Sequence, residues 1–195
     1  MSSSPSSRGR PRDPRSHAAI VRAAAELVVE VGYAATSIGA VAARAGVGKD
    51  TVYRRWRGKP DLVYEAVFTT TDRAPAPDTG TLTGDLTALV QALVDEFRAP
   101  GAAAALPGLL ADFAADPELK ARIRGDFLAP AKERLGIVFA RAAARGEIAD
   151  DTPADLVLDL LAGTVFFHVG LVGQEPDPGL AGRLAAVAAS GIEVR

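Results

Sequence analysis

The chain contains 195 residues, of which 48% are hydrophobic, and this length and composition suffice for a compact chain with a buried core. It contains no Cys and only two His, which excludes disulfides, a thiol nucleophile and thiolate-bound metal. The net charge is −2, yet residues 1–67 carry 11 Lys and Arg against 6 Asp and Glu, and residues 68–195 carry 11 against 18. A basic N-terminal part is therefore joined to an acidic remainder, which favours an anionic partner for the first part.

The first 13 residues are expected to form a disordered basic arm. Residues 1–7 are rich in Ser and Pro without an apolar run, so they are neither a secretory signal nor a membrane anchor. The Arg-Gly-Arg-Pro segment that follows resembles an AT-hook, whose arginines enter the minor groove of A·T-rich DNA. We expect minor-groove or phosphate contacts from Arg8, Arg10 and Arg12, with a solvated tether as the alternative.

A helix-turn-helix domain is expected over residues 14–67. Its first helix begins at Asp13-Pro14, carries an apolar stripe with helical spacing and ends at Gly32. Ser37 is placed to cap a second helix, and Gly46 lies in a tight turn where a positive φ or a close helix approach excludes larger side chains. Two helices joined by a short turn that contains Gly are typical of a DNA-reading helix-turn-helix.

The helix after this turn divides into an inward and an outward face. Val52 and Trp56 lie four residues apart and are expected to face the core. The remaining side chains, most of them polar or cationic, are left on the other sides: Lys49, Thr51, Tyr53, Arg54 and Arg55. An amphipathic helix pair without a DNA-binding role is the alternative interpretation of this pattern alone.

The sequence of residues 16–67 resembles the N-terminal DNA-binding domain of the TetR (tetracycline repressor-like) family of bacterial transcription regulators. The matching residues are Gly32-Tyr33, Thr36-Ser37-Ile38, Val41-Ala42, Ala45-Gly46-Val47, Gly48-Lys49, Thr51-Val52-Tyr53-Arg54-Arg55-Trp56, Lys59 and Asp61-Leu62. Two residues depart from the family pattern, because Gly48 stands where Ser is usual and Asp50 where a small residue is commoner. Gly remains acceptable as a helix cap, whereas the charge of Asp50 would repel a nearby phosphate unless it accepts from a cytosine amine.

The resemblance implies DNA-binding roles for individual side chains of this domain. The implied set is Ser37, Lys49, Thr51, Tyr53, Arg54, Arg55 and Lys59. Lys49 and Tyr53 would approach base edges or the adjacent backbone, and Arg54 is a further candidate reader of guanine. Thr51, Arg54 and Arg55 would contact phosphates. Lys59 resembles the phosphate-binding lysine of the family, and the N-terminus of the next helix would favour the same anion.

A joint between the basic and acidic parts is expected after this domain. The segment from Asp61 to about Arg73 reads as a connecting helix. Pro75, Pro77 and Gly80 interrupt the helical pattern that follows. Residues 68–195 are then expected to form an effector-binding and dimerisation domain, as the resemblance implies.

The remaining chain reads as helical throughout. Helices are expected over residues 82–97, 102–115 and 117–145. Pro107-Gly108 predicts that the second is short or broken, and Pro130 predicts a bend or break in the third. Because no alternating strand pattern occurs, the expected fold class is all-α, with a three-helix head, a larger helical body and about nine helices.

The last two helices carry more apolar surface than one core requires. After Asp151-Thr152-Pro153, one helix face carries Leu156, Leu160, Gly163 and Phe167, and another carries Val157, Leu161, Val165 and Val172. A helix that is apolar all round needs burial on two sides. In the resembling family these helices pair with their copies, which implies a dimer interface at Leu156, Leu160, Gly163, Phe167, Leu180, Leu184 and Val187. A monomer with a well-filled core is the alternative.

The family resemblance also implies a ligand cavity among the C-terminal helices. The candidate lining residues are Phe97, Phe113, Phe127, Phe166, Phe167 and His168, and plain core packing is the alternative for each. Few charges interrupt the apolar stripes, which favours a neutral or hydrophobic effector. The expected partners are this effector, double-stranded DNA and a second copy of the chain, with no membrane, cofactor or metal.

Enzyme functions find little support in the sequence. No His-Glu-x-x-His pattern, phosphate-binding loop or dinucleotide-binding glycine motif is present. The favoured function is a cytoplasmic, ligand-responsive transcription regulator. Two alternatives remain, namely a small-molecule carrier or enzyme whose DNA motif has become structural, and an architectural DNA protein that uses only its Arg-rich arm.

Overall fold

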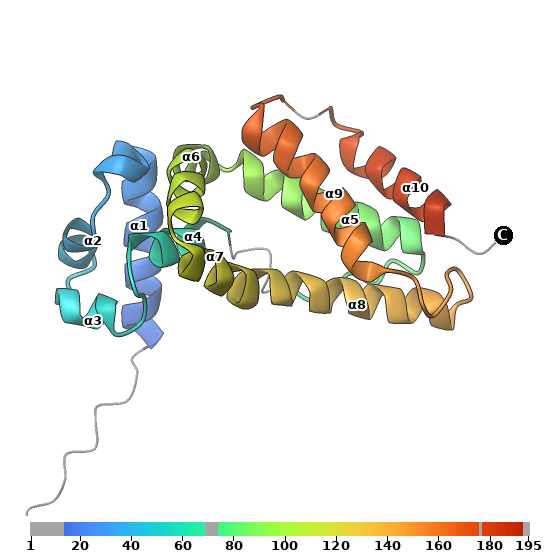
Figure 1. Cartoon of the computed structure of the whole chain (residues 1–195), viewed down its shortest axis with the longest axis horizontal. Coiled ribbons are helices and arrows are strands. Elements are labelled where there is room, and N and C mark those ends of the chain that lie inside the picture. Colours follow the sequence, from blue (N-terminus) through green and yellow to red (C-terminus); the bar gives the residue numbers. More distant parts are fainter. Residues whose placement is uncertain (1–13, 69–73, 176, 193–195) are drawn as a thin grey trace, which may run out of the picture.

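The computed structural model of the chain describes residues 14–68, 74–175 and 177–192, apart from the side chains of Pro14, Asp126 and Phe127. These residues form ten α-helices and two π-helical segments (Figure 1). In chain order they are α1 (Pro14–Ala35), α2 (Ile38–Arg44), α3 (Lys49–Tyr53), α4 (Lys59–Phe68), α5 (Leu82–Arg98), α6 (Pro100–Ala115), α7 (Pro117–Ile123), η1 (Arg124–Leu128), α8 (Ala129–Ala144), α9 (Ala154–Val165), η2 (Phe166–Leu171) and α10 (Leu180–Ile192). The all-α fold class is confirmed, with ten helices where the sequence suggested about nine.

Helices α1 to α4 form a head at one end of the molecule (Figure 1). The apolar stripe of α1 packs against the next three helices around buried Ile20, Val41, Val52, Trp56 and Leu62. This burial, rather than helix propensity, must hold the short α2 and α3, since isolated helices of their length are unstable in water.

The sequence signals at Ser37 and Gly32 in the head, and at Asp116 in the body, operate as predicted. The Ser37 hydroxyl caps α2 by accepting a hydrogen bond from the amide of Ala40 at 3.2 Å. Gly32 has a φ of +78° and leaves the helical conformation inside the span assigned to α1. Asp116 caps α7 by accepting from the amides of Glu118 and Leu119.

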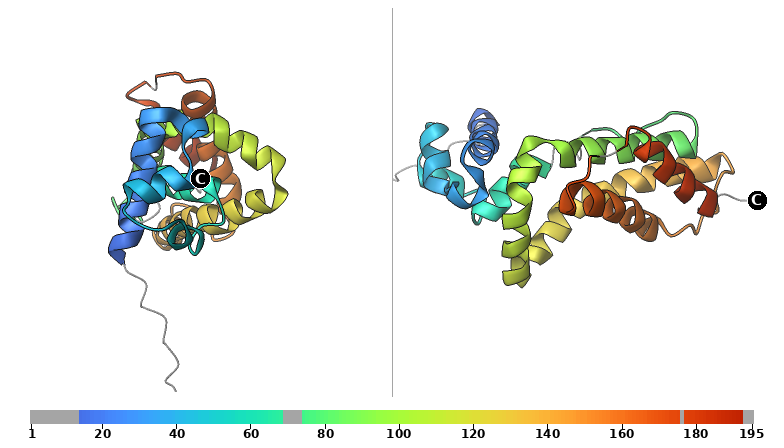
Figure 2. Two further views of the ribbon diagram at one scale, coloured as in Figure 1. Left: turned by 90° about the vertical axis from the view of Figure 1, so that its left-hand side faces the viewer. Right: turned by 90° about the horizontal axis from the view of Figure 1, so that it is seen from above.

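The head and the body share a second buried core. Helix α6 packs against α1 and α4 through Val28, Tyr33, Val63, Leu106 and Leu109. Beyond this junction, α5, α8, α9 and α10 extend away from the head, and Figure 2 shows α6 and α7 between the two ends. The core of the body, formed mainly by α5, α8, α9 and α10, includes Leu86, Val138, Leu161 and Ala185. The head is therefore attached to the body by packed side chains and not only by the chain connection.

The prediction of a short or broken helix at Pro107 is wrong. Helix α6 runs without interruption over Pro100–Ala115 and contains Pro107. Pro removes one backbone hydrogen bond and crowds the preceding turn. Burial of Ala102, Ala105, Leu106 and Leu109 against the head compensates for this cost through tertiary contacts.

The single helix expected over residues 117–145 is interrupted before Pro130. Helix α7 ends at Ile123, η1 follows, and α8 begins at Ala129 with Pro130 in its first turn. In the first turn of a helix the missing amide of Pro is harmless. The regular α-helix is therefore interrupted by a π-helical segment just before Pro130, where the sequence predicts a bend or break, and the residues at both junctions keep right-handed helical dihedral angles.

The segment Ala154–Leu171, which comprises α9 and η2, is long and apolar enough to cross a membrane by length and composition alone. Core helices of water-soluble proteins pass the same test. One face of this segment packs into the body core through Val157, Leu161 and Val165. Only 22% of the segment is buried, so its other face lies open on the surface.

Candidate nucleic-acid interface

Helices α2 and α3 are joined by a tight turn centred on Gly46. Its φ of +67° lies in the left-handed region, which side chains other than Gly rarely adopt. The amides of Gly46 and Val47 donate to the carbonyls of Ala43 and Ala42 and close the turn. Gly48 then caps α3 without a side-chain hydrogen bond. The turn thus fixes the direction in which α3 leaves α2.

The two faces of α3 lie as the sequence predicts. Val52 is fully buried and Trp56 is 4% exposed, while Tyr53 is 55% exposed. Arg54 is exposed, and its guanidinium donates to the Thr51 hydroxyl at 3.3 Å. A hydroxyl-bearing and cationic surface therefore points outward from a helix whose underside is anchored in the head.

Lys49 extends from the start of α3 across α2. A Cβ placed on Gly39 would lie 3.0 Å from the Lys49 Cε and 3.3 Å from its Nζ. The missing side chain of Gly39 therefore makes room for this lysine. Lys49 and Ser37 are both exposed beside Gly39, so a cation and a hydroxyl share one part of the head surface.

Two of the candidate DNA-binding cations, Arg55 and Lys59, form hydrogen bonds to α1. Arg55 is half-buried and donates to the hydroxyl of Ser16 on α1 at 3.2 Å. The Lys59 ammonium donates to the backbone carbonyl of Tyr33 at 3.0 Å and lies 4.1 Å from the centre of the Tyr33 ring. Sequence reasoning did not anticipate these contacts, because each joins α1 or its end to a segment far along the chain.

Comparison with known proteins identifies the family of the chain. The family model "Bacterial regulatory proteins, tetR family" matches residues 20–66, and the model "Tetracyclin repressor-like, C-terminal domain" matches residues 76–188. The chain belongs to the TetR family. The first match contains the whole of α2, α3 and the turn between them, so this TetR-family protein is a transcriptional regulator with a DNA-binding helix-turn-helix.

Individual relatives agree with this assignment. The uncharacterized HTH-type transcriptional regulator YdeS of Bacillus subtilis is 30% identical over 87% of this chain and 86% of its own length. The DNA-binding transcriptional repressor TetR of Mycobacteroides abscessus is 30% identical over 86% of this chain and 88% of its own. The solved structure of the TetR family transcription regulator SCO0332 has a TM-score of 0.75 over 91% of this chain and 98% of its own, at 24% identity. These relatives are regulators and not enzymes.

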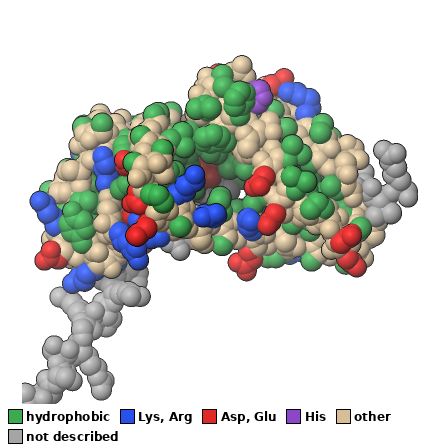
Figure 3. All heavy atoms as spheres, in the orientation of Figure 1, with side chains coloured by type: hydrophobic (Ala, Val, Ile, Leu, Met, Phe, Trp, Pro, Cys, Tyr) green, Lys and Arg blue, Asp and Glu red, His purple; other side chains and the backbone are tan. Residues whose placement is uncertain are grey.

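Charge is unevenly exposed on this TetR-family chain. In the space-filling view, Lys and Arg side chains are frequent over the head (Figure 3). Several carboxylates there are paired, as in the Glu30 side chain, which accepts from both terminal nitrogens of Arg44 at 2.7 and 2.6 Å. This hydrogen bond from Arg44 lowers the pKa of Glu30. Arg8, Arg10 and Arg12 lie outside the described residues.

The seven candidate dimer-interface residues lie on α9, η2 and α10. Leu156, Leu160, Phe167 and Val187 are 66, 50, 51 and 65% exposed, Gly163 is also exposed, and Leu180 and Leu184 are half-buried. Two further apolar side chains near them, Leu171 and Val172, are at least half exposed. Hydrophobic side chains are visible over this part of the body in Figure 3.

Three of the candidate pocket residues come together in space. Phe97 contacts Phe166 at 6.0 Å between ring centres and Phe68 at 5.6 Å. Phe113 lies 6.1 Å from Tyr64, which in turn lies 5.3 Å from Phe68. We call these five rings, contributed by α4, α5, α6 and η2, the aromatic cluster. It lies where the head meets the body.

The other candidate pocket residues lie elsewhere. Phe167 is on the exposed face of η2, and its ring meets His168 edge-on at 5.4 Å. His168 in turn bonds Gln174 at 3.0 Å. The side chain of Phe127 lies outside the described residues.

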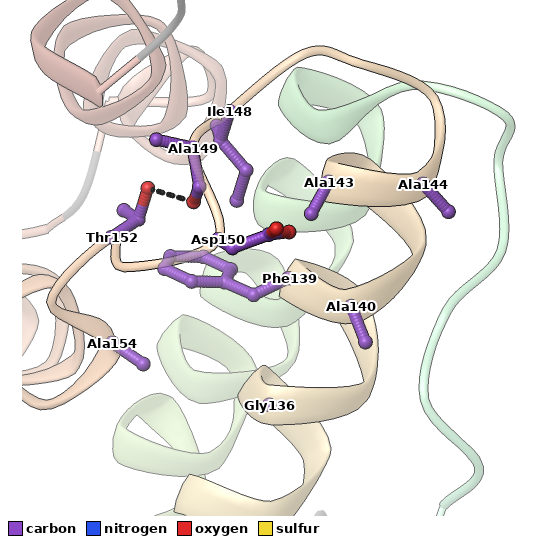
Figure 4. Close-up of a pocket in the computed structure, with 10 residues that line it drawn as sticks. All are labelled: Gly136, Phe139, Ala140, Ala143, Ala144, Ile148, Ala149, Asp150, Thr152 and Ala154. Atoms are coloured by element: carbon purple, nitrogen blue, oxygen red, sulfur yellow. Dashed lines mark hydrogen bonds between the residues drawn. The ribbon is translucent and has the colours of Figure 1, made fainter.

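A groove of about 490 Å³ lies on the body, between α8 and the loop that leads to α9 (Figure 4). The ring of Phe139 and small side chains of α8 form one wall, and Ile148, Asp150 and Thr152 come from the loop. The Thr152 hydroxyl donates to the carbonyl of Ala149 at 2.7 Å and is thus engaged within the loop. None of the candidate pocket residues lines this groove.

Proposed function

We propose that this TetR-family protein is a ligand-responsive repressor that binds a palindromic operator as a homodimer and releases it when a small effector occupies the body. The exposed apolar face of α9, η2 and α10 is the observation that carries this proposal. Repression is proposed by likeness to the Mycobacteroides abscessus relative, which is described as a repressor. A protein that binds chromosomal DNA works in the cytoplasm.

The apolar face supports dimerisation because its residues are both large and contiguous. Leu156, Leu160 and Phe167 follow helical spacing on one side of α9 and η2, opposite the side that fills the body core. Val187 adds a 65% exposed side chain on the neighbouring α10. Monomeric soluble proteins rarely expose contiguous apolar patches of this kind. A second copy of the same helices would bury the face symmetrically.

The aromatic cluster supports the site proposed for the effector. Phe97, Phe113 and Phe166 remain partly exposed to solvent although each contacts another ring of the cluster. Aromatic side chains favour a neutral or hydrophobic ligand. Because Tyr64 and Phe68 of the cluster belong to α4, a ligand there would touch the helix that follows the recognition unit.

The exposure of side chains on the head supports the proposed DNA contacts. Lys49, Tyr53 and Arg54 are exposed on or beside α3. Lys49 and Tyr53 would reach base edges, and Arg54 would reach a phosphate or a guanine. Ser37 and Thr51 would contact phosphates, joined by Arg55 and Lys59 after release from their present partners. The proposed division is an arm over residues 1–13, a DNA-binding domain over 14–67 and an effector and dimerisation domain over 68–195.

Selection of bound duplexes from random DNA tests the proposal directly. The full-length protein should enrich an inverted repeat whose half-sites lie about one helical turn apart or a multiple of it. With about 8–10 phosphate contacts per dimer, the logarithm of affinity should fall with the logarithm of salt concentration with a slope of about −7 to −9. Sedimentation should give the mass of a dimer. A single unrepeated site, A·T preference without symmetry, or a monomer would contradict the proposal.

A further inference from the structure

Glu65 on α4 joins two aromatic side chains from other parts of the head. Its Oε2 accepts a hydrogen bond from the indole Nε1 of Trp56 at 2.7 Å, and its Oε1 lies 2.9 Å from the Nε2 of His17 on α1. The His17 ring stacks on the indole, with ring centres 5.1 Å apart and an angle of 22° between the planes. Both oxygens of one carboxylate are thus used to hold the indole between α1 and α4.

Trp56 is the residue through which this arrangement acts on the DNA-reading helix. The amide of Trp56 donates to the carbonyl of Val52 at 3.1 Å, so the indole lies one turn beyond the buried residue of α3. Helix α3 itself has only five residues, and its N-cap Gly48 provides no side-chain hydrogen bond. Such a short helix has little stability of its own, so anchors at its end must fix its direction.

A second contact, made by the residue next to Trp56, also joins the segment after α3 to α1. Arg55, which precedes Trp56, donates to the hydroxyl of Ser16, which precedes His17. Two successive residues after α3 therefore contact two successive residues of α1.

The indole N–H donates to the carboxylate of Glu65, whose side chain is 18% exposed. Hydrogen bonds to a partly buried ionised group are among the stronger ones in proteins.

We propose that Glu65 is a positioning residue for DNA recognition, which holds Trp56 and thereby sets the orientation of Tyr53 and Arg54 on α3. This role rests on DNA binding through α3, as proposed above. Glu65 would contact no DNA. It would act through the indole and the imidazole that it fixes.

The sign of its effect separates this role from simple electrostatics. Residues 1–67 have 11 cations and 6 anions, and removal of an anion from such a surface strengthens attraction to DNA. A positioning role predicts the opposite result, because an indole without its acceptor would leave α3 free to adopt several orientations. Loss of the carboxylate should therefore weaken binding to a specific sequence although the head becomes more positive.

The experiment compares full-length Glu65→Ala and Glu65→Gln with the wild-type protein. The probes are an inverted-repeat duplex enriched by the wild type from random DNA and a scrambled duplex of equal length. Glu26→Ala is the matched control, because this carboxylate on α1 is 48% exposed and its contacts, to Arg22 and Arg44, are 3.8 and 4.0 Å long. Emission of Trp56, which is the chain's single tryptophan, reports the environment of the indole in every variant.

Glu65→Ala should weaken binding of the enriched duplex about tenfold and leave the scrambled duplex bound equally or more tightly. Glu65→Gln should stay within about twofold of the wild type, since its amide can accept from the indole and donate to a neutral imidazole. The emission maximum should shift in Glu65→Ala and remain unchanged in Glu65→Gln and Glu26→Ala.

Equal or tighter binding of the enriched duplex by Glu65→Ala would overturn the proposal. If Glu65→Ala fails to fold, the affinity of Trp56→Phe for the enriched duplex tests the proposal instead, because this change removes the indole N–H and keeps an aromatic ring. Unchanged affinity in Trp56→Phe would then overturn it, and a loss of several-fold would support it. If Arg54→Ala also binds the enriched duplex like the wild type, the proposed DNA-reading role of α3 itself fails.

Discussion

The ring of Tyr33 lies directly over Gly108, and a Cβ at position 108 would be only 2.1 Å from the Tyr33 Cδ1. Tyr33 follows Gly32 at the end of the regular part of α1, and Gly108 lies within α6. The Tyr33 hydroxyl also donates to Asp112, one turn further along α6. Burial and the carboxylate of Asp112 together raise the pKa of Tyr33, so the phenol stays protonated and can donate. This buried ring is one of the contacts that join the head to the body.

Gly108→Ala should therefore destabilise the protein. In a helix the change from Gly to Ala normally stabilises by about 0.5–1 kcal/mol, but overpacking against Tyr33 should cost about 1–3 kcal/mol. Urea unfolding at a fixed protein concentration measures the difference. Gly136→Ala on α8 is the matched control, because a Cβ there meets nothing within 4 Å. A Gly108→Ala variant as stable as Gly136→Ala would show that the two ends are not packed in this way.

Arg54→Ala should weaken DNA binding without unfolding the head. The side chain is exposed and donates a hydrogen bond to the Thr51 hydroxyl one turn earlier, so little folding energy depends on it. If each Arg54 of a dimer contacts one phosphate, the salt slope should become shallower by about 2. Arg98→Ala on α5 is the control, since that arginine is 51% exposed and pairs with Glu175 in the body. An unfolded Arg54→Ala variant would mean that this arginine belongs to the core.

The local structure of the head could be predicted because its signals are local. Ser37 as a cap, Gly46 at a positive φ, and the opposite placement of Tyr53 and Trp56 each depend on residues within one or two turns. Helical spacing alone separates the buried from the exposed side of α3. The same helical spacing separates buried Val157, Leu161 and Val165 from the exposed face of α9. Val172, which the sequence places on their face, is 50% exposed, because the π-helical η2 lies between Val165 and Val172 and changes the spacing.

Long-range partners could not be predicted in the same way. Tyr33 and Asp112 are 79 residues apart, and nothing near either residue indicates the other. Helix α6 continues through Pro107 because it is packed on the head, which local propensity does not record. Glu65 gave no signal at all, since a single Glu on an amphipathic helix usually lies on a solvated face. Only the fold brings it to Trp56.

Leu160→Glu should convert the proposed dimer into monomers. This leucine is 50% exposed in the middle of the apolar face of α9, so a charge there would be buried without a partner when two copies meet. Sedimentation should show half the wild-type mass, and binding of the enriched inverted repeat should be lost. Ile137→Glu on α8 places the same charge at a residue that is 40% exposed outside this face and should remain a dimer. A dimeric Leu160→Glu protein would place the interface elsewhere.

Glu147 links the loop after α8 to the start of α5 and should make stability depend on acid pH. Its Oε2 accepts from the amide of Leu82 at 2.5 Å, and its Oε1 pairs with Arg145. The hydrogen bond from Arg145, followed by that from Leu82, lowers the pKa of Glu147. A carboxyl whose pKa is lower in the folded state stabilises the protein above its unfolded pKa, about 4.3, and loses this effect as the pH falls through the lowered value.

Glu147→Gln should therefore unfold at lower urea than the wild type at neutral pH, while the gap between the two should narrow by pH about 3. The glutamine can still accept a hydrogen bond from the Leu82 amide. The change therefore removes the charge and the ion pair with Arg145 but leaves the hydrogen bond to the first amide of α5. Glu133→Gln, an exposed carboxylate on α8, should show no such convergence. If the difference in urea stability between Glu147→Gln and the wild type were equal at both pH values, the charge of Glu147 would contribute nothing to stability. Glu147 would then stabilise the fold only through its hydrogen bond with the Leu82 amide. A gap that widened in acid would mean that protonation of Glu147 strengthens the fold, contrary to the direction of its pKa shift.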